Sequence, residues 1–358
     1  MMKRNRLKIT IISIFVGLLV GAFILLAVGF NPLEAYAIMI RGIFGKPKYI
    51  SWTIIKSTPL ILTGISVAFA FRTGLFNIGA EGQFIIGALV ATLVGYFWNL
   101  PPVIHAIVAI LMACLAAAIW AGLAGFLKAR FGVNEVITTI MLNWIALYLS
   151  NAIVFWDKFK RPNSEASQKI LETASIRFPK GINFLGDFFR APVNWGFIIA
   201  IIAAILIRHI LKNTTLGYQL RAVGFNSDAA EYGGIDVKKN IVISMAIAGA
   251  LSGLAGAVHV LGVTEEVSVL AAMEGNGFDG IAVSLIAANS SIGCIFAGLL
   301  FGGLKYGGYK IQPAMGAPSE IINIVIGIIV FFISMPKLIE MLTTLRVRRK
   351  RGGEIESK

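Results

Sequence analysis

Long apolar runs separated by short polar gaps constrain the fold of this chain more than any other feature of its sequence. Hydrophobic residues make up 57% of its 358 residues and charged residues only 14%, whereas a soluble domain normally carries about 25% charged residues. The runs reach the length of about 20 residues with which a helix crosses the hydrocarbon core of a bilayer. Because the apolar excess covers nearly the whole chain, the sequence predicts an all-α, polytopic transmembrane helical bundle.

Hydropathy places about ten spans in the chain, within a range of eight to ten. They fall near 9–30, 52–71, 75–97, 102–127, 134–156, 193–211, 240–262, 277–290, 292–308 and 319–336. The first apolar run is longer than the roughly 7–15 residues of a signal-peptide core, so it is interpreted as a span that follows a basic, cytoplasmic end. Glycine and polar residues break the third, eighth and ninth runs.

Ten spans with the N-terminus inside divide the chain into three parts. Residues 1–50 hold the basic start, the first span and an outer connection; residues 51–336 form a transmembrane core; and residues 337–358 form a basic cytoplasmic tail. Within the core, residues 157–192 form an outer loop and residues 211–240 a cytoplasmic loop.

The distribution of basic residues supports this orientation only in part. The outer loop carries seven basic residues (Lys158, Lys160, Arg161, Lys169, Arg177, Lys180 and Arg190) against four acidic ones (Asp157, Glu165, Glu172 and Asp187). The net charge of +14 is explained by loops and a tail that face anionic lipid, so no nucleic-acid partner is predicted.

No catalytic constellation is visible in the sequence. The three histidines lie on different apolar runs, and the motifs H-E-x-x-H, G-x-S-x-G and C-x-x-C are absent. Cys114 and Cys294 lack metal-ligand spacing. We therefore expect no catalytic residue, no metal site and no cofactor. The phosphate-binding loop G-x-x-x-x-G-K-[ST] is absent too, so any ATP-driven transport needs a separate ATPase subunit.

Three polar clusters lie at the margins of apolar runs, where polar residues are costly and often functional. They are 72–83, 134–143 and 274–280. In the first and third, paired glycines beside Asn and carboxylates predict interrupted helices, whose freed backbone groups must line protein or a wet cavity. Interface caps and interhelical hydrogen bonds are the alternative interpretation. The polar candidates for a solute pathway are Asn77, Glu81, Gln83, Glu135, Asn143, Asn276 and Asp279.

The polar segment 211–240 between two apolar runs is too small to be a domain. Asn226 can cap a short helix that begins at Ser227-Asp228 and ends at Gly233-Gly234. A helix of about two turns is marginal in isolation, because helices below roughly 12–15 residues are unstable in water. We expect it to dock onto a partner protein.

Four phrases, in order, resemble inner-membrane permeases of ABC importers. They are FRTGLFNIGAEGQFIIGA (71–88), NEVITTIMLNWIA (134–146), GYQLRAVGFNSDAAEYGGID (217–236) and GNGFDGIAVSLIAANS (275–290). The resemblance is to the branched-chain amino acid, ribose and nucleoside permeases, and within them to purine-nucleoside (guanosine-type) permeases that work with a lipoprotein receptor. The short connection at Asn289-Ser290-Ser291 departs from a glycine-rich turn common among relatives.

The resemblance implies a multi-pass permease of the inner (plasma) membrane with the fold of the larger-bundle importers. It implies three partners: a second permease (a related chain in a heterodimer, or a second copy), a cytoplasmic ATP-binding subunit and an extracytoplasmic lipoprotein receptor. Phe76 or Trp144 would stack on a nucleoside base. The segment 211–240 would contact the ATPase through Gly217, Arg221, Gly224, Asp228, Ala229, Ala230, Gly233 and Ile235.

Other functions remain open from the residues alone. A simple sugar would use the same polar side chains without base stacking. An ion-coupled secondary transporter would titrate Glu81, Glu135 or Asp279. A channel would pass solute without ATP, and a membrane enzyme is disfavoured because no nucleophile–base pair or metal set is present.

Overall fold

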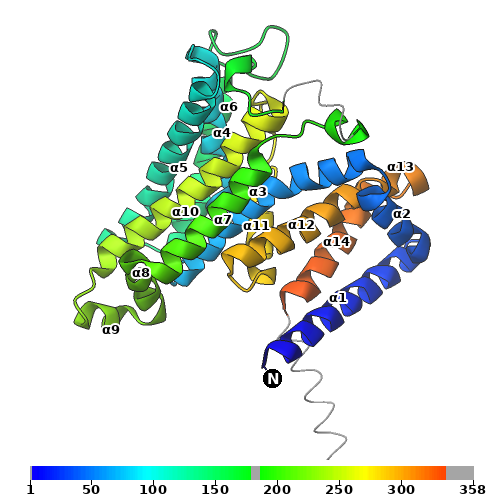
Figure 1. Cartoon of the computed structure of the whole chain (residues 1–358), viewed down its shortest axis with the longest axis horizontal. Coiled ribbons are helices and arrows are strands. Elements are labelled where there is room, and N and C mark those ends of the chain that lie inside the picture. Colours follow the sequence, from blue (N-terminus) through cyan, green and yellow to red (C-terminus); the bar gives the residue numbers. More distant parts are fainter. Residues whose placement is uncertain (1, 179–185, 336–358) are drawn as a thin grey trace, which may run out of the picture. The chain divides into compact units, whose positions relative to one another are not determined.

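The computed structural model describes residues 2–178 and 186–335, and every extended element of regular structure within them is helical (Figure 1). Three isolated β-bridges are the only strand-like pairings in this described part. Contacts divide the chain into two units, one made of 1–45 with 304–358 and the other of 46–303. The predicted core of 51–336 draws on both units and stays a prediction, and the predicted tail of 337–358 lies outside the described residues.

The first unit contains a sharply bent pair of helices. Between helix α1 (Met2–Ala27) and helix α2 (Pro32–Phe44) the chain bends by 120°. Gly29 adopts a φ of +87° at the break, and the side chain of Asn31 caps α2 by accepting from the N–H of Leu33 at 3.1 Å. The end of α12, α13 (Ile311–Met315) and α14 (Ser319–Ser334) complete this unit.

The second unit carries most of the helices. They are α3 (Pro47–Arg72), α4 (Ala80–Phe97), α5 (Ile104–Phe131), α6 (Glu135–Val154), α7 (Gly196–Asn213), α8 (Thr215–Phe225), α9 (Ser227–Tyr232), α10 (Val237–His259), α11 (Asn276–Ile286) and α12 (Ser291–Gly308). Helix α12 passes into the first unit at Leu304. Short turns η1 (Glu172–Ala174) and η2 (Gly186–Arg190) lie in the 155–195 loop, and the π-turn η3 (Val260–Thr264) continues α10.

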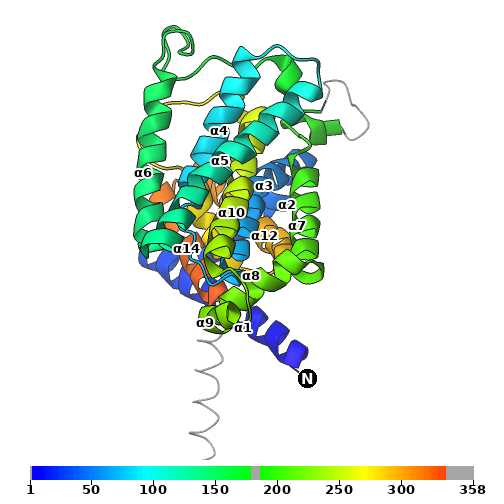
Figure 2. The same cartoon turned by 90° about the vertical axis from the view of Figure 1, so that its left-hand side faces the viewer.

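Helices α5 and α10 pack closely through small residues (Figure 2). Ala113, Ala117 and Ala121 of α5 are fully buried. A Cβ atom on Gly253 of α10 would lie 2.8 Å from the carbonyl oxygen of Ala113. Small side chains at such a contact let the two backbones approach, as is typical of membrane helices.

Within residues 2–178 and 186–335, seven helices are long and apolar enough to cross a membrane, or eight if the bent pair counts as one span. The polytopic helical bundle is thereby confirmed, although seven spans fall below the expected eight to ten and eight reach only its lower limit. The predicted span near 277–290 differs, because α11 has only 11 residues. At 1.5 Å per residue it measures about 16 Å, roughly half of a hydrocarbon core. Helix α14, with 16 residues, is also short.

The segment between α10 and α12 is an interrupted crossing of the second unit. Near Val267 it is paired with the 155–195 loop, since the N–H of Ser167 donates to the Val267 carbonyl at 2.8 Å. It then runs without regular structure to Gly275 and continues as α11. At its other end, the side chain of Arg72 donates to the Asn289 carbonyl at 3.1 Å. The predicted interruption at the third polar cluster is therefore present.

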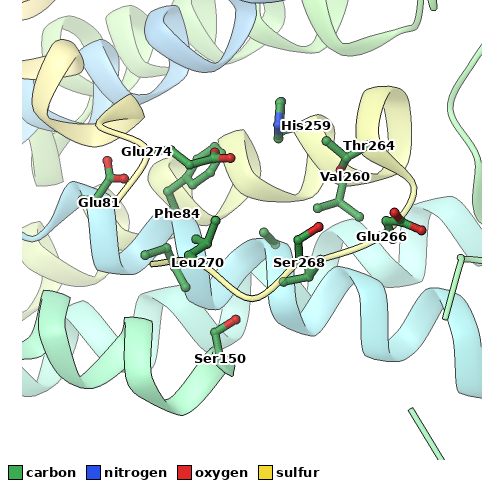
Figure 3. Close-up of a pocket in the computed structure, with 13 residues that line it drawn as sticks. Glu81, Phe84, Ser150, His259, Val260, Thr264, Glu266, Ser268, Leu270 and Glu274 are labelled. Carbon is green, nitrogen blue, oxygen red and sulfur yellow. The ribbon is translucent and has the colours of Figure 1, made fainter. Parts of the chain in front are cut away.

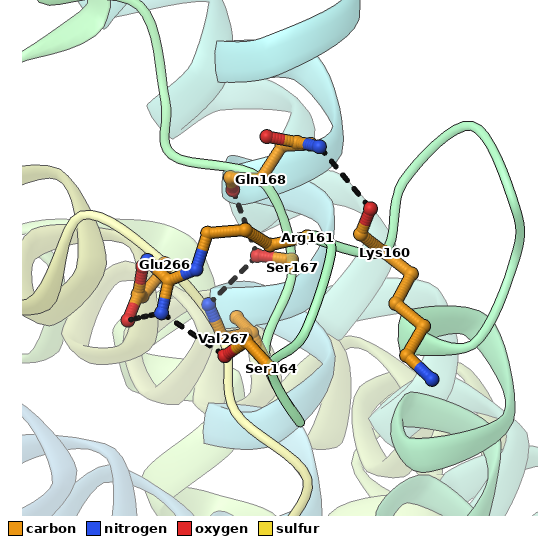
Figure 4. Close-up of polar contacts among 7 residues, drawn as sticks. All are labelled: Lys160, Arg161, Ser164, Ser167, Gln168, Glu266 and Val267. Carbon is orange, nitrogen blue, oxygen red and sulfur yellow. Dashed lines mark hydrogen bonds and ion pairs between the residues drawn. The ribbon is translucent and has the colours of Figure 1, made fainter.

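The two ends of the second unit differ in character (Figures 1 and 2). One end carries α8 and α9 and is called the α8–α9 end; the other carries the 155–195 loop and is called the loop end. At the loop end, Arg161 forms an ion pair with Glu266 (Figure 4). Arg177 forms a second ion pair, with Glu265. These distant glutamates offset part of the excess positive charge that the sequence places in this loop.

Candidate functional site

Glu81, in the first turn of α4, holds the interrupted crossing in place. Its buried carboxylate accepts hydrogen bonds from the backbone N–H groups of Gly275, at 2.8 Å, and Gly277. Gly275 stands just before α11 with a φ of +83°, a conformation that suits glycine. The start of a helix presents unpaired N–H groups and a partial positive charge. The carboxylate satisfies both, so Glu81 fixes where α11 begins.

Three predicted pathway residues form one buried amide cluster. The side-chain amides of Asn77 and Gln83 donate to each other at 3.0 and 2.9 Å. Asn143 of α6 accepts from the N–H of Gly82 at 2.8 Å and donates to the Ile78 carbonyl at 3.1 Å. All three side chains are buried. They tie the α3–α4 turn to α6, which matches the alternative of interhelical hydrogen bonds.

The remaining predicted pathway residues are dispersed. Phe76 stacks on Phe71 with ring centroids 5.2 Å apart. Glu135 forms an ion pair with Lys128 at 2.6 Å, where α5 and α6 meet. Trp144 is exposed on α6.

The last two predicted pathway residues, Asn276 and Asp279, lie on α11. The side chain of Asn276 donates to Glu274 at 3.0 Å, and the backbone carbonyl of Asn276 accepts from Thr63 at 3.0 Å. Asp279 is half-buried one turn further on. The structure therefore gathers the third polar cluster around Glu81 and leaves Glu135 and Trp144 apart from it.

A cavity of about 280 Å³ lies between α4, α6, the end of α10 and the segment 264–274 (Figure 3). Its polar lining consists of Glu81, Ser150, His259, Thr264, Glu266, Ser268 and Glu274. Phe84 and His259 face each other there, with ring centroids 5.7 Å apart and planes at 45°. Of the predicted pathway residues, Glu81 alone lines this cavity. It offers carboxylates, hydroxyls and aromatic faces to a polar solute.

Ser150 adds a hydroxyl to the lining of the cavity. Its hydroxyl is buried and has no hydrogen-bond partner in the described part of the chain. Leaving a buried polar group unpaired costs about 1–3 kcal/mol, so a solute or water that reaches it is stabilised. Ser150 lies seven residues after Asn143 on the same helix face. That spacing is a signal from which the sequence could have identified it.

The loop end fixes the outer part of this cavity. The π-turn η3 ends at Glu265, which has a φ of +62°. The side chains of Arg177 and Asn194 both donate to the Gly262 carbonyl, at 3.0 and 3.3 Å. π-turns are rare overall, but those that occur are often at functional sites. The 155–195 loop supplies the missing donors.

The short helix predicted after Asn226 is confirmed as α9. Asn226 accepts from the N–H groups of Asp228 and Ala229, each at 3.0 Å. Gly233 follows the last helical residue, and Gly234 has a φ of +80°. Ala230 is buried, whereas the other α9 residues predicted to couple are exposed.

Two aromatic residues of the α8–α9 region escaped the sequence analysis. Phe225 is 89% exposed and Tyr232 is 97% exposed. Phe225 ends α8 and Tyr232 ends α9, so both large side chains are exposed on the same short stretch of chain.

Helix α8 rests on the turn that joins α3 to α4. A Cβ atom on Gly224 would lie 2.9 Å from the backbone of Thr73, and one on Gly74 would lie 3.3 Å from the Cα of Gly224. Gly217 is buried against Leu211 at the start of α8. Arg221 donates to the Gly217 carbonyl at 3.2 Å. The α3–α4 turn thus connects α8 directly to Asn77 and Glu81.

Comparison with known proteins adds named relatives. The chain is 44% identical over 335 residues to the guanosine ABC transporter permease protein NupP of Bacillus subtilis, which covers 93% of this chain and 95% of the relative. It is 36% identical over 347 residues to the nucleoside ABC transporter permease protein NupB of Lactococcus lactis, covering 95% and 94%.

Two further relatives are less similar in sequence. The glucose ABC transporter permease protein TsgB13 of Haloferax volcanii is 29% identical over 326 residues, covering 90% of this chain and 86% of the relative. A second guanosine permease protein of Bacillus subtilis, NupQ, is 30% identical over 248 residues, covering 69% and 77%.

The family match extends through all three polar clusters and the α8–α9 region. Residues 49–334 match the family described as branched-chain amino acid transport system, permease component. A permease component works as the membrane-spanning, non-catalytic part of a larger transport system. The chain belongs to this family of multi-pass ABC transporter permeases.

Proposed function

We propose that the chain imports nucleosides, with guanosine as the representative substrate. The observation that carries this proposal is the 44% identity to NupP over almost the full length of both chains. NupB, whose name also specifies nucleosides, is the next relative in similarity among those described above. The cavity beside Glu81 supports the same substrate class on chemical grounds.

A nucleoside needs an aromatic surface for its base and hydrogen-bond partners for its base edge and ribose. The Phe84–His259 pair provides ring faces, and Ser150 and Ser268 provide hydroxyls. Glu274 adds a carboxylate that can accept from ribose hydroxyls or base N–H groups. A pocket built to pair with such groups rejects analogues that lack them, because its own polar groups are then unpaired.

The pathway residues predicted from sequence take a supporting role in this proposal. Asn77, Gln83 and Asn143 shape the α3–α4 turn, and Glu81 fixes the start of α11. Phe76, Glu135, Trp144, Asn276 and Asp279 remain candidates for other steps along the path.

ATP hydrolysis by a separate subunit would drive the transport through α8 and α9. The docking surface is the short helix α9, with Tyr232 exposed at its end and Phe225 exposed just before its start. Movement there would reach the cavity through the contact of Gly224 with the α3–α4 turn. The α8–α9 end is then cytoplasmic, and the loop end receives substrate from an extracytoplasmic lipoprotein receptor.

A second permease subunit completes the proposed assembly. NupP and NupQ are two different guanosine permease proteins of one organism, and this chain is similar to both. A heterodimer of this chain with a related permease is therefore favoured over a pair of identical chains. Co-purification of the tagged chain tests this: a stoichiometric second permease supports the heterodimer, and a pair of identical chains contradicts it.

A simple sugar is the second candidate substrate, because TsgB13 is named a glucose permease. Uptake competition in a deletion strain that expresses this chain separates the two. Radiolabelled guanosine is offered with unlabelled adenosine, uridine, ribose or glucose. We expect nucleosides to compete and both sugars to fail. Ribose or glucose outcompeting every nucleoside would overturn the nucleoside assignment, and uptake without ATP would favour an ion-coupled transporter or channel.

A further inference from the structure

A basic pocket at the α8–α9 end has no role in the function proposed so far. It has a volume of about 190 Å³ and lies where α3, α7, α8 and the α11–α12 turn meet. Arg72, Arg208, Lys212 and Arg221 contribute four positive charges to its lining. No carboxylate in residues 2–178 or 186–335 forms an ion pair with any of them. Four cations around one cavity repel one another unless an anion lies between them.

The α11–α12 turn, which also lines the pocket, favours an anion as well. Ser290, Ser291 and Ile292 line it at the N-terminus of α12. The first N–H groups of a helix have no partner inside the helix and carry a partial positive charge. Backbone N–H groups, serine hydroxyls and guanidinium groups together form the donor set that proteins use for phosphate.

The backbone of this turn is held in an unusual conformation. Ala288 and Asn289 have φ values of 49° and 56°, in the left-handed region that non-glycine residues rarely adopt. Arg72 holds the Asn289 carbonyl at 3.1 Å, and Ser284 donates to the Asn289 side chain at 2.8 Å. Such strain persists where the surroundings fix it and is frequent at ligand sites.

The position of the pocket identifies the source of the phosphate. Helix α7 leads away from Arg208 with an exposed apolar face that includes Ile198, Ile202, Ile205 and Leu206. Acyl chains can lie along this face while a headgroup occupies the pocket. Basic pockets between membrane helices on the cytoplasmic side are suited to anionic headgroups.

We propose that this pocket binds the phosphate of an anionic phospholipid headgroup. The bound lipid joins α3, α7, α8 and the α11–α12 turn, and it neutralises charges that otherwise oppose the packing of α8. The proposal concerns binding and does not depend on which solute the permease carries.

The test compares two double variants of the full-length chain. Arg208→Gln with Lys212→Gln removes two exposed charges from the pocket. Lys238→Gln with Lys239→Gln removes two exposed charges from α10, outside the pocket lining. Native mass spectrometry in detergent measures the apparent Kd of the first phosphatidylglycerol. We expect the pocket variant to weaken binding about 30-fold, at roughly fivefold per charge, and the control variant to change it less than about threefold.

Three further outcomes would each overturn the proposal. An equal loss in both double variants would mean that phosphatidylglycerol meets only the general charge of this end. Equal affinity for phosphatidylcholine would mean that the charge of the lipid is not recognised. Displacement of phosphatidylglycerol by inorganic phosphate at equal concentration would identify a soluble phosphate as the ligand. Unchanged helical circular dichroism and gel-filtration volume establish that both variants are folded.

Discussion

The carboxylate of Glu81 fixes the point at which the irregular segment ends and α11 begins. The effect of removing this carboxylate can be calculated. In Glu81→Gln, one acceptor oxygen remains and the other becomes an NH2 group that faces a backbone N–H of Gly275 or Gly277. A hydrogen bond to a charged group contributes about 1.5–3 kcal/mol, and a buried donor left unpaired costs about 1–3 kcal/mol. We expect the free energy of opening at residues 274–277 to fall by about 2–3 kcal/mol.

Amide hydrogen exchange of the full chain in nanodiscs measures this opening directly. At about 1.4 kcal/mol per factor of ten, peptides that cover 270–280 should exchange about 30- to 150-fold faster in the variant. Peptides from α5 and α10 should not change. A protease that cleaves near residues 270 and 280 gives the needed resolution, and both proteins are compared at the same pH.

Glu274→Gln is the matched control. Its carboxylate lies on the same segment but is exposed, and within the described part of the chain it accepts a hydrogen bond from the side-chain amide of Asn276, at 3.0 Å. We expect less than about a fivefold change in exchange, as for an exposed polar contact of at most about 1 kcal/mol. If Glu81→Gln exchanges no faster than this control, an ionised carboxylate does not hold the break, and the reasoning is wrong.

Other predictions follow from single contacts. Gly224→Leu should reduce ATP-driven uptake to below about a tenth, because its side chain would push α8 off the Thr73 backbone at a cost of about 1–3 kcal/mol; normal uptake in the folded variant would contradict the proposed transmission. Phe225→Ser with Tyr232→Ser should abolish co-purification of the ATPase and leave the melting temperature of the permease unchanged; retained co-purification would place the docking surface elsewhere. Ser150→Ala should raise the KM for guanosine uptake about tenfold without destabilising the chain, because the Ser150 hydroxyl has no partner to lose; an unchanged KM would show that the solute does not reach this hydroxyl. Arg177→Gln should speed exchange in the 260–266 region by removing the ion pair with Glu265 and a donor to the Gly262 carbonyl; unchanged exchange would mean that the loop does not hold the π-turn.

Local signals were sufficient for several elements. The cap at Asn226 and the glycines after Tyr232 defined α9 correctly, because capping and termination depend on residues within one or two turns. The apolar runs identified the membrane helices for the same reason, since length and hydropathy are properties of the segment itself.

Other elements depended on contacts between distant segments. The hydropathy of 277–290 is compatible with a full span, yet the chain forms an 11-residue helix there, because Glu81, nearly 200 residues earlier, pairs with the N–H groups at its start. The amide cluster of Asn77, Gln83 and Asn143 has the same origin. A polar residue beside an apolar run can face a cavity or bond another helix, and only the packing decides between them.

The sequence by itself therefore determined the membrane class, the capped helix α9 and the family resemblance, because each is encoded in consecutive residues. The tertiary structure alone decided which polar groups line the cavity: it occupied most of the predicted ones with internal hydrogen bonds and left the hydroxyl of Ser150 without a partner among the described residues. It also brought four basic side chains from three helices around one pocket. Such convergence is a property of folding in three dimensions, and spacing along the chain does not encode it.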